Sequence, residues 1–234
     1  MSKVEQPVVS EAEQQIITID GPAGAGKTTL ARALARRLGW RYLDTGAMYR
    51  AVALAVDEAG VEVSNARGVE AVLAGLDLEV RLDPRETRLF LGAREVTSLI
   101  RDPRISAIAS AISALPQVRQ KMAQVQQALG REGRIVTEGR DQGTVVFLAA
   151  GLKFFLDADP EERARRRYKE LTHQDQAAAL DQVGREMAER DEADSSRQVS
   201  PLRPAEDAVR FDSTRLSVDE VLERMLDHVR QKGW

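Results

Sequence analysis

The chain has 234 residues, of which 43% are apolar, enough for one large domain or for a core domain that carries a small insert. Its net charge of −3 argues against non-specific nucleic-acid binding. The absence of cysteine excludes disulfides, thiolate metal sites and cysteine nucleophiles, and two histidines, His173 and His228, are too few for a multi-histidine metal site.

The first residues, MSKVEQPVVSEAEQQ, are polar and acidic and lack the apolar stretch of a signal peptide. No apolar run elsewhere approaches the roughly 20 residues that a membrane-spanning helix needs. We therefore expect a cytoplasmic protein in which residues 1–14 form a flexible tail.

The predicted core begins with a short β-branched run at 15–20, which indicates a strand. Leucines at helical spacing then predict a helix over 27–38. A second helix is predicted over 45–60, where Gly60 ends it.

After the second helix the pattern changes to three short alternating runs, separated by turn signals at Asp83-Pro84 and Gly92. Alternation over runs of this length indicates a small antiparallel sheet. We assign residues 68–105 to an insert in the core domain. The core then consists of residues 15–67 and 106–234.

Helix and strand patterns alternate again after the insert. Asp159 and Pro160 give a strong helix start, and Ser217 and Glu220 form a capping box for a C-terminal helix. This alternation predicts an α/β fold in which a parallel sheet has helices on both faces. The other predicted elements are helices over 104–115, 117–129, 159–171 and 175–193, and strands over 134–138, 152–157 and 208–212.

The stretch GPAGAGKT fits the G-x-x-x-x-G-K-[ST] phosphate-binding motif and lies between a predicted strand and a predicted helix. Its backbone amides and the helix N-terminus suit the phosphates of a nucleoside triphosphate. Lys27 would reach the β and γ oxygens, and the Thr28 hydroxyl suits Mg²⁺. The predicted ATP-binding residues are Gly21, Pro22, Ala23, Gly24, Ala25, Gly26, Lys27, Thr28 and Thr29.

Two further stretches place polar side chains where predicted elements begin or end. EGRDQGTVVF puts Arg140 and Asp141 directly behind an apolar strand, and the carboxyl ends of parallel strands are where such sheets bind ligands. LDTGAMYR puts Thr45, Tyr49 and Arg50 at a helix start. Taken alone, these residues also fit a salt-bridged turn, a helix N-cap and a solvated surface charge.

Five motifs, GPAGAGKTT, LDTGAMYR, EGRDQGTVVF, RDEADSSR and DSTRLS, resemble in this order and spacing the bacterial cytidylate kinases, from about residue 15 to the C-terminus. The resemblance implies a P-loop nucleoside-monophosphate-kinase fold, with the insert in the monophosphate-binding region and a helical lid over about 158–175. It implies phosphate transfer from ATP to CMP or dCMP with Mg²⁺, in pyrimidine nucleotide metabolism. It also implies a monomer without a nucleic-acid or membrane partner.

The same resemblance implies roles for individual residues. Asp141 would accept a hydrogen bond from the exocyclic amino group of cytosine, the pairing that a carboxylate makes with this base. Ser110 and Arg119 would help to read the ring, and Arg190 and Asp194 would bind the pentose. The complete set of expected CMP-binding residues is Thr45, Tyr49, Arg50, Ser110, Arg119, Arg140, Asp141, Arg190, Asp194 and Arg197.

Lys27, Arg140, Arg163 and Arg167 are the residues that we expect to act on the transferring phosphoryl group. Arg163, Arg166 and Arg167 are spaced so that a helix gathers them on one side, as a closing lid would require. The alternative to a lid is a solvent-exposed helix in which these arginines pair with glutamates. Glu138 either orients a magnesium-bound water or is an ordinary turn residue.

Two other functions remain open at this point. The acceptor could be UMP or another nucleoside monophosphate, and Asp141 is the residue that distinguishes these cases. A regulatory P-loop NTPase is the alternative from another class, although the sequence has no N-K-x-D base-reading motif.

Overall fold

The computed structural model describes residues 15–173 and 179–234 of the chain. The predicted tail over 1–14 and the start of the helix predicted over 175–193 lie outside these residues. Within the described part, no helix combines the length and apolarity needed to cross a membrane.

The core is a five-stranded sheet in which every pair of neighbours is parallel, in the order β2-β6-β1-β7-β8. Residues of β1, β6 and most of β7 are buried, as expected for strands that helices cover on both faces. The strands are β1 (Ile16–Asp20), β2 (Arg41–Asp44), β6 (Ile135–Gly139), β7 (Leu152–Asp157) and β8 (Val209–Asp212).

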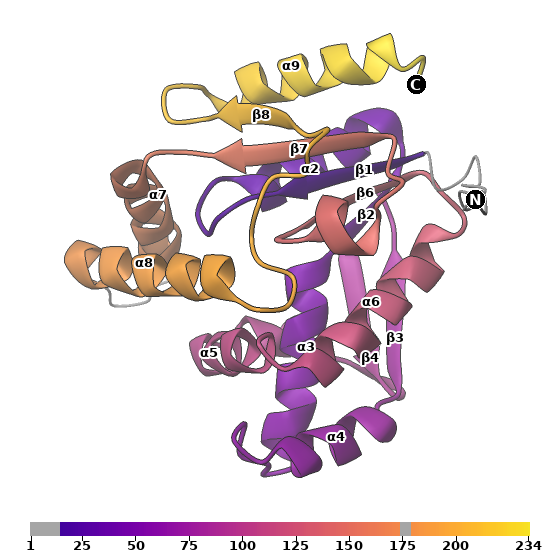
Figure 1. The fold of residues 1–234 in the computed structure, drawn as a ribbon, viewed down its shortest axis with the longest axis vertical. Helices are drawn as coiled ribbons and strands as arrows, with labels where there is room; N and C mark the ends of the chain where they lie inside the picture. The colour runs from indigo at the N-terminus through magenta and orange to yellow at the C-terminus, as the bar shows by residue number, and fades with distance from the viewer. Residues whose placement is uncertain (1–14, 174–178) are drawn as a thin grey trace, which may run out of the picture.

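Helices cover both faces of this sheet, which confirms the predicted α/β class (Figure 1). On one face α2 (Lys27–Leu38) and α9 (Val218–Gln231) share a core with β1, β7 and β8. On the other face α3 (Thr45–Glu58), α5 (Pro103–Ile112) and α6 (Pro116–Gly130) form a second core. The predicted capping box of Ser217 and Glu220 is present at the start of α9.

The predicted insert contains an antiparallel sheet of three strands, β3 (Leu78–Leu82), β4 (Thr87–Leu91) and β5 (Arg94–Glu95). It is followed by a short 3₁₀ helix, η1 (Leu99–Arg101). Leu89 and Val96 are fully buried in the same core as Met48 of α3. The antiparallel prediction is therefore confirmed, and the insert shares its apolar interior with the main domain.

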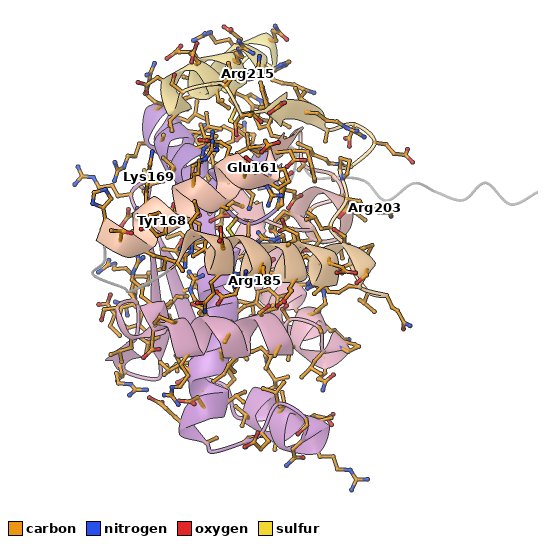
Figure 2. The ribbon with its side chains drawn as sticks, turned by 90° about the vertical axis from the view of Figure 1, so that its left-hand side faces the viewer. Glu161, Tyr168, Lys169, Arg185, Arg203 and Arg215 are labelled. Atoms are coloured by element: carbon orange, nitrogen blue, oxygen red, sulfur yellow. The ribbon has the colours of Figure 1, made fainter. Side chains whose placement is uncertain are left out.

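Helices α7 (Pro160–His173) and α8 (Leu180–Ser196) lie beside each other at the carboxyl ends of the strands (Figure 1). Figure 2 views the molecule from their side, with Tyr168 and Lys169 labelled on α7 and Arg185 on α8. Ala164, Val183 and Met187 join the two helices in a small apolar cluster, and Ala23 packs against it. This helix pair therefore contacts the phosphate-binding loop directly.

The sequence prediction missed several elements, among them one strand and one helix of the main domain and insert, and it gave one helix different limits. Strand β2 has only Tyr42 and Leu43 as apolar residues, too few to show a pattern. Helix α4 (Ala66–Ala74), capped by the Asn65 side chain, was not recognised either. The helix predicted over 175–193 corresponds to α8 (Leu180–Ser196), which ends three residues later than predicted, while residues 175–178 lie outside the described residues.

Candidate active site

The phosphate-binding loop connects the end of β1 to the start of α2, as the motif predicts. A Cβ at Gly21 would lie 2.0 Å from the carbonyl oxygen of Leu156, so a side chain cannot fit there. Gly24 has a φ of +71°, and a Cβ there would meet Met187 at 2.6 Å. Glycine is therefore needed at both positions, for close approach and for the left-handed turn.

Lys27 begins α2 and is buried, with 5% of its surface exposed. Its Nζ donates to the carbonyl oxygen of Pro22 at 2.6 Å, which holds the side chain over the loop. Burial, and then the positive charge of Arg140, lower the pKa of Lys27 to about 7. An anion bound at the loop would favour its charged form.

Thr28, in the first turn of α2, and Glu138, near the end of β6, bring two side-chain oxygen atoms together. The Thr28 hydroxyl donates to Glu138 Oε1 at 2.6 Å, and the Tyr42 hydroxyl donates to the same oxygen at 3.3 Å. Burial, and then the nearby charge of Asp44, raise the pKa of Glu138. A hydroxyl and a carboxylate are the hard oxygen ligands that suit Mg²⁺.

The loop after β6 is fixed to the end of β1 by a buried carboxylate. Asp20 accepts hydrogen bonds from the backbone amides of Gln142 at 2.9 Å and Gly143 at 2.8 Å. These amides begin a single π-helical turn, η2 (Gln142–Val146). Burial raises the pKa of Asp20 to about 6, although both amide hydrogen bonds act in the opposite direction.

Asp141 and Arg119 form a buried ion pair, with 5% and 6% of their surfaces exposed. Arg119 also donates from Nη1 to the carbonyl oxygen of Ser113 at 3.1 Å, and the Ser113 hydroxyl donates to the carbonyl oxygen of Ser110 at 2.7 Å. The predicted residues Ser110, Arg119 and Asp141 are thus brought together through Ser113.

Asp194 holds two of the predicted arginines. Arg140 donates from Nε to Asp194 Oδ2 at 2.7 Å, and Arg197 donates from Nη2 to Asp194 Oδ1 at 2.7 Å. Burial opposes ionisation here, but Arg140 and Arg197 hold the pKa of Asp194 below its usual range. Arg190 on α8 is close enough for its charge to contribute in the same direction.

The residues of LDTGAMYR lie on the other side of the β6 loop. Thr45 is buried, and its hydroxyl donates to the carbonyl oxygen of Glu138 at 2.7 Å. The Tyr49 ring lies under the Arg119 guanidinium at 5.8 Å, and burial raises the pKa of Tyr49 to about 12. Arg50 pairs with Asp44 at 3.4 Å. Asp44, not Thr45, is the N-cap of α3, because its side chain accepts from the amide of Ala47 at 2.7 Å.

The three arginines of α7, which the prediction assigns to a closing lid, contact three different parts of the protein. Arg163 donates from Nη1 to the carbonyl oxygen of Ala23 at 3.1 Å and pairs with Asp191. Arg166 donates to the hydroxyl and carbonyl oxygens of Ser213 at 3.0 and 2.7 Å. Arg167 is paired with Glu170 at 3.1 Å. Each guanidinium already has a protein partner in a different direction.

Sequence reasoning missed several carboxylates that position the site. Asp191 accepts from the amide of Ala23 at 3.1 Å while it pairs with Arg163, so it fastens α7 and α8 to the phosphate-binding loop. Asp191 lies within the quoted motif RDEADSSR, and Asp20 directly precedes the phosphate-binding motif. Their position beside recognised motifs was the available signal.

A phosphate-binding loop after β1, beside an arginine-bearing loop after β6, defines the class of P-loop phosphotransferases. A family model of cytidylate kinase matches residues 17–231. This chain belongs to the cytidylate kinase family.

Individual relatives agree with this assignment. The cytidylate kinase of Geobacter sulfurreducens is 49% identical over 221 residues, which cover 93% of this chain and 93% of that protein. The cytidylate kinase of Carboxydothermus hydrogenoformans is 43% identical over 217 residues, covering 93% of this chain and 98% of that protein. A solved structure of an uncharacterized protein from Eubacterium ventriosum has a TM-score of 0.51 at 10% identity, over 93% and 99% of the two chains, a likeness of fold alone.

Proposed function

We propose that this chain transfers a phosphoryl group from ATP to CMP and dCMP, forming ADP and CDP or dCDP. The observation that carries this proposal is the pairing of β1 with β6, in which Asp20 is opposite Gly139. Neighbouring strands lie about 4.8 Å apart, so the donor and acceptor loops begin side by side.

Recognition of cytosine rests on the buried pair of Arg119 and Asp141. Arg119 fixes one oxygen of Asp141, and the carboxylate retains acceptor capacity for the exocyclic amino group of cytosine. Uracil has a carbonyl oxygen at this position, so two acceptors would face each other. An unsatisfied buried acceptor costs about 1–3 kcal/mol, which is roughly a tenfold to hundredfold preference for cytosine.

The acceptor phosphate is bound by Arg140 with Arg50 and Arg197 nearby. In the structure Asp194 is the common partner of Arg140 and Arg197, and it holds both side chains in place before a phosphate arrives. An incoming phosphate would share these guanidinium groups, and Asp194, with Arg190 beside it, would be free to accept from a pentose hydroxyl. The 3′-hydroxyl is present in both CMP and dCMP.

Transfer itself needs little covalent help from the protein, because the attacking phosphate oxygen is already ionised near neutral pH. Lys27 and Arg140 would stabilise charge on the transferring group. Arg163 would act first by fixing the phosphate-binding loop at Ala23. Arg167 would have to leave Glu170 before it could reach the phosphates.

The side-chain oxygen atoms of Thr28 and Glu138 suit Mg²⁺, and we propose that they lie beside an ion that arrives with ATP. When bound, Mg²⁺ would neutralise charge on the phosphate oxygens. The Thr28 hydroxyl would be its protein ligand, and Glu138 would orient a coordinated water.

We also propose a function for each part of the chain. Residues 15–67 and 106–234 form the kinase core, and residues 68–105 form the monophosphate-binding insert. Residues of about 158–175 belong to a lid that excludes water during transfer. The protein is proposed to act as a cytoplasmic monomer, without a nucleic-acid or membrane partner.

The test measures ADP formation from ATP and Mg²⁺ with CMP, dCMP, UMP, AMP or no acceptor. Turnover confined to CMP and dCMP is expected, and turnover with UMP or AMP alone would contradict the proposed acceptor. Acceptor-independent hydrolysis alone would identify an NTPase instead. The Asp141→Ala variant is expected to lose more activity with CMP than with UMP, and equal losses would refute the base-reading role.

A further inference from the structure

A cavity of about 440 Å³ lies between the core and the insert, away from the Arg119–Asp141 pair and from Asp194. Helix α2, the start of α3, the turn between β3 and β4, and η1 contribute its walls. Five arginines and three carboxylates line it, which leaves a net charge of +2. The arginines are Arg32, Arg36, Arg50, Arg85 and Arg101, and the carboxylates are Asp44, Asp83 and Glu86.

The carboxylates of this cavity are already engaged. Asp44 caps α3 and pairs with Arg50 at 3.4 Å. Asp83 accepts from the backbone amides of Arg85 and Glu86 at 2.6 and 3.1 Å, which closes the β3–β4 turn. The Glu86 carboxylate lies 3.7 Å from Arg88. These acids therefore fix the shape of the walls, and they offset only three of the five arginine charges around the cavity.

Four of the five arginines are without a counter-ion. Among residues 15–173 and 179–234, no carboxylate lies within 4.0 Å of the guanidinium groups of Arg32, Arg36, Arg85 or Arg101. The Nε of Arg32 is buried and makes no hydrogen bond in this part of the chain. Arg32 and Arg36 are also four residues apart on α2, a spacing at which like charges repel. Such an arrangement is stabilised when an anion enters.

We propose that this cavity binds a di- or triphosphate group, at a site that shares Arg50 with the proposed acceptor site but includes neither the phosphate-binding loop nor the Arg119–Asp141 pair. The four guanidinium groups come from three elements around a cavity of about 440 Å³, and a chain of linked phosphates offers them more oxygen acceptors and more negative charge than a single phosphate does. The walls offer no open aromatic face for a base, because Tyr42 is fully buried and Arg32 lies 5.5 Å over its ring. The site therefore recognises phosphate and not a nucleobase.

An occupant would connect the core to the insert and would also contact the catalytic centre indirectly. Arg32 lies over Tyr42, and the Tyr42 hydroxyl donates to Glu138, which accepts from Thr28. Arg50 lines this cavity and also belongs to the proposed acceptor site. Binding at the cavity is therefore expected to affect turnover as well as stability.

The test titrates tripolyphosphate into the full-length Lys27→Ala protein, in which the phosphate-binding loop is weakened, and follows binding by calorimetry. In that background the double variant Arg85→Ala/Arg101→Ala removes two exposed arginines of the cavity. A matched control, Arg94→Ala/Arg104→Ala, removes the same charge from side chains that pair with Glu58 and Asp57.

The cavity variant is expected to bind tripolyphosphate at least about tenfold more weakly, the effect of losing one charge-assisted hydrogen bond or more. The control variant is expected to stay within about twofold at physiological salt, because distant charges are screened. Equal losses in the two variants, or no loss in either, would overturn the proposal. Unchanged unfolding temperatures would show that both variants remain folded.

Further ligands distinguish the source of the phosphate chain. If CTP and ATP bind as tripolyphosphate does, and the cavity variant loses this binding, the site reads the tail of a nucleotide. If only pyrophosphate and tripolyphosphate bind, it reads inorganic polyphosphate, which equally supports the proposal. Inorganic monophosphate binding as tightly as tripolyphosphate would overturn it.

Discussion

At the scale of single residues, burial shifts two oppositely charged groups next to the phosphate-binding loop toward their neutral forms. Lys27 has its pKa lowered to about 7, and Asp20 has its pKa raised to about 6. Each shift reflects the free-energy cost of holding a charge away from water. Both groups therefore give the protein a measurable dependence on pH.

Binding of ATP is expected to take up a proton. At pH 8 the Lys27 amine of the free protein is mostly neutral, and a bound triphosphate favours its charged form, so uptake approaches about one proton. Calorimetry in buffers of different ionisation enthalpy measures this number. The Lys27→Arg variant is the control, since its guanidinium stays charged throughout. The same uptake in wild type and variant would refute the prediction.

Asp20 is expected to make the folded state less stable as the pH rises. Its pKa is raised in the folded state, so the folded protein binds the proton more tightly than the unfolded chain, and stability is lost between about pH 4 and 6. Near pH 7 the loss amounts to about 3 kcal/mol, at about 1.4 kcal/mol for each pKa unit. Urea unfolding of wild type and Asp20→Asn at several pH values measures it.

The difference between the unfolding free energies of wild type and Asp20→Asn cancels the contribution of all other titrating groups. The unfolding free energy of Asp20→Asn should increase relative to that of the wild type as the pH rises from about 4 to about 6. A difference in unfolding free energy that does not change with pH would show that Asp20 titrates normally.

At the scale of elements, α7 and α8 are fastened to the phosphate-binding loop by Arg163 and Asp191. Asp191→Ala is expected to lower kcat/KM for ATP by about tenfold, because the hydrogen bond from the Ala23 amide is lost and Arg163 loses its closest carboxylate partner. The amides of α7 and α8 should also exchange faster with solvent. Steady-state kinetics and hydrogen exchange measure these effects.

The control for this variant is Asp181→Ala, in the exposed first turn of the same helix. It should leave both measurements unchanged. If Asp191→Ala behaves like this control, the helix pair is held to the loop by its apolar cluster and not by the carboxylate.

The sequence predicted those elements whose pattern is local. The phosphate-binding loop, the capping box of α9 and the periodic helices each depend on residues a few positions apart. Strand β2 could not be recognised because only two of its four residues are apolar, which is too few to show a pattern. Its place in the sheet depends on pairing with β6.

The site was only partly predictable for the same reason. Motifs singled out Arg140, Asp141 and Asp194 as candidates, but the partners of these residues depend on the folded chain: Arg140 pairs with Asp194, which is 54 positions away. The helical spacing of Arg163 and Arg167 suggested that their side chains point in a common direction. In the structure these long side chains contact different neighbours. Long arginine side chains choose partners by tertiary contacts, which a helical period does not encode.

At the scale of the whole molecule, the insert and the core share one apolar interior, so we expect them to unfold as one cooperative unit. Leu89→Ala is expected to lower the free energy of unfolding by about 2–5 kcal/mol, because it leaves a cavity in the apolar interior that β4 shares with α3. Fluorescence of Trp40 and Trp234, which lie in contact against the core of the other sheet face, should report the same shift as circular dichroism.

The control is Leu99→Ala, which removes a leucine that is 47% exposed on η1 and should change stability little. If Leu89→Ala unfolds in two separate transitions and its tryptophan transition is unchanged, the insert is an independent domain.

The pairing of β1 with β6 has a consequence for redesign. The separation of the donor and acceptor loops is set by backbone hydrogen bonds between two central strands, in which Asp20 is opposite Gly139. Side-chain substitutions in either loop leave that spacing intact. We therefore expect that substitutions at the proposed base-reading residues, Asp141 and Arg119, change the base preference without moving the nucleotide that supplies the phosphate.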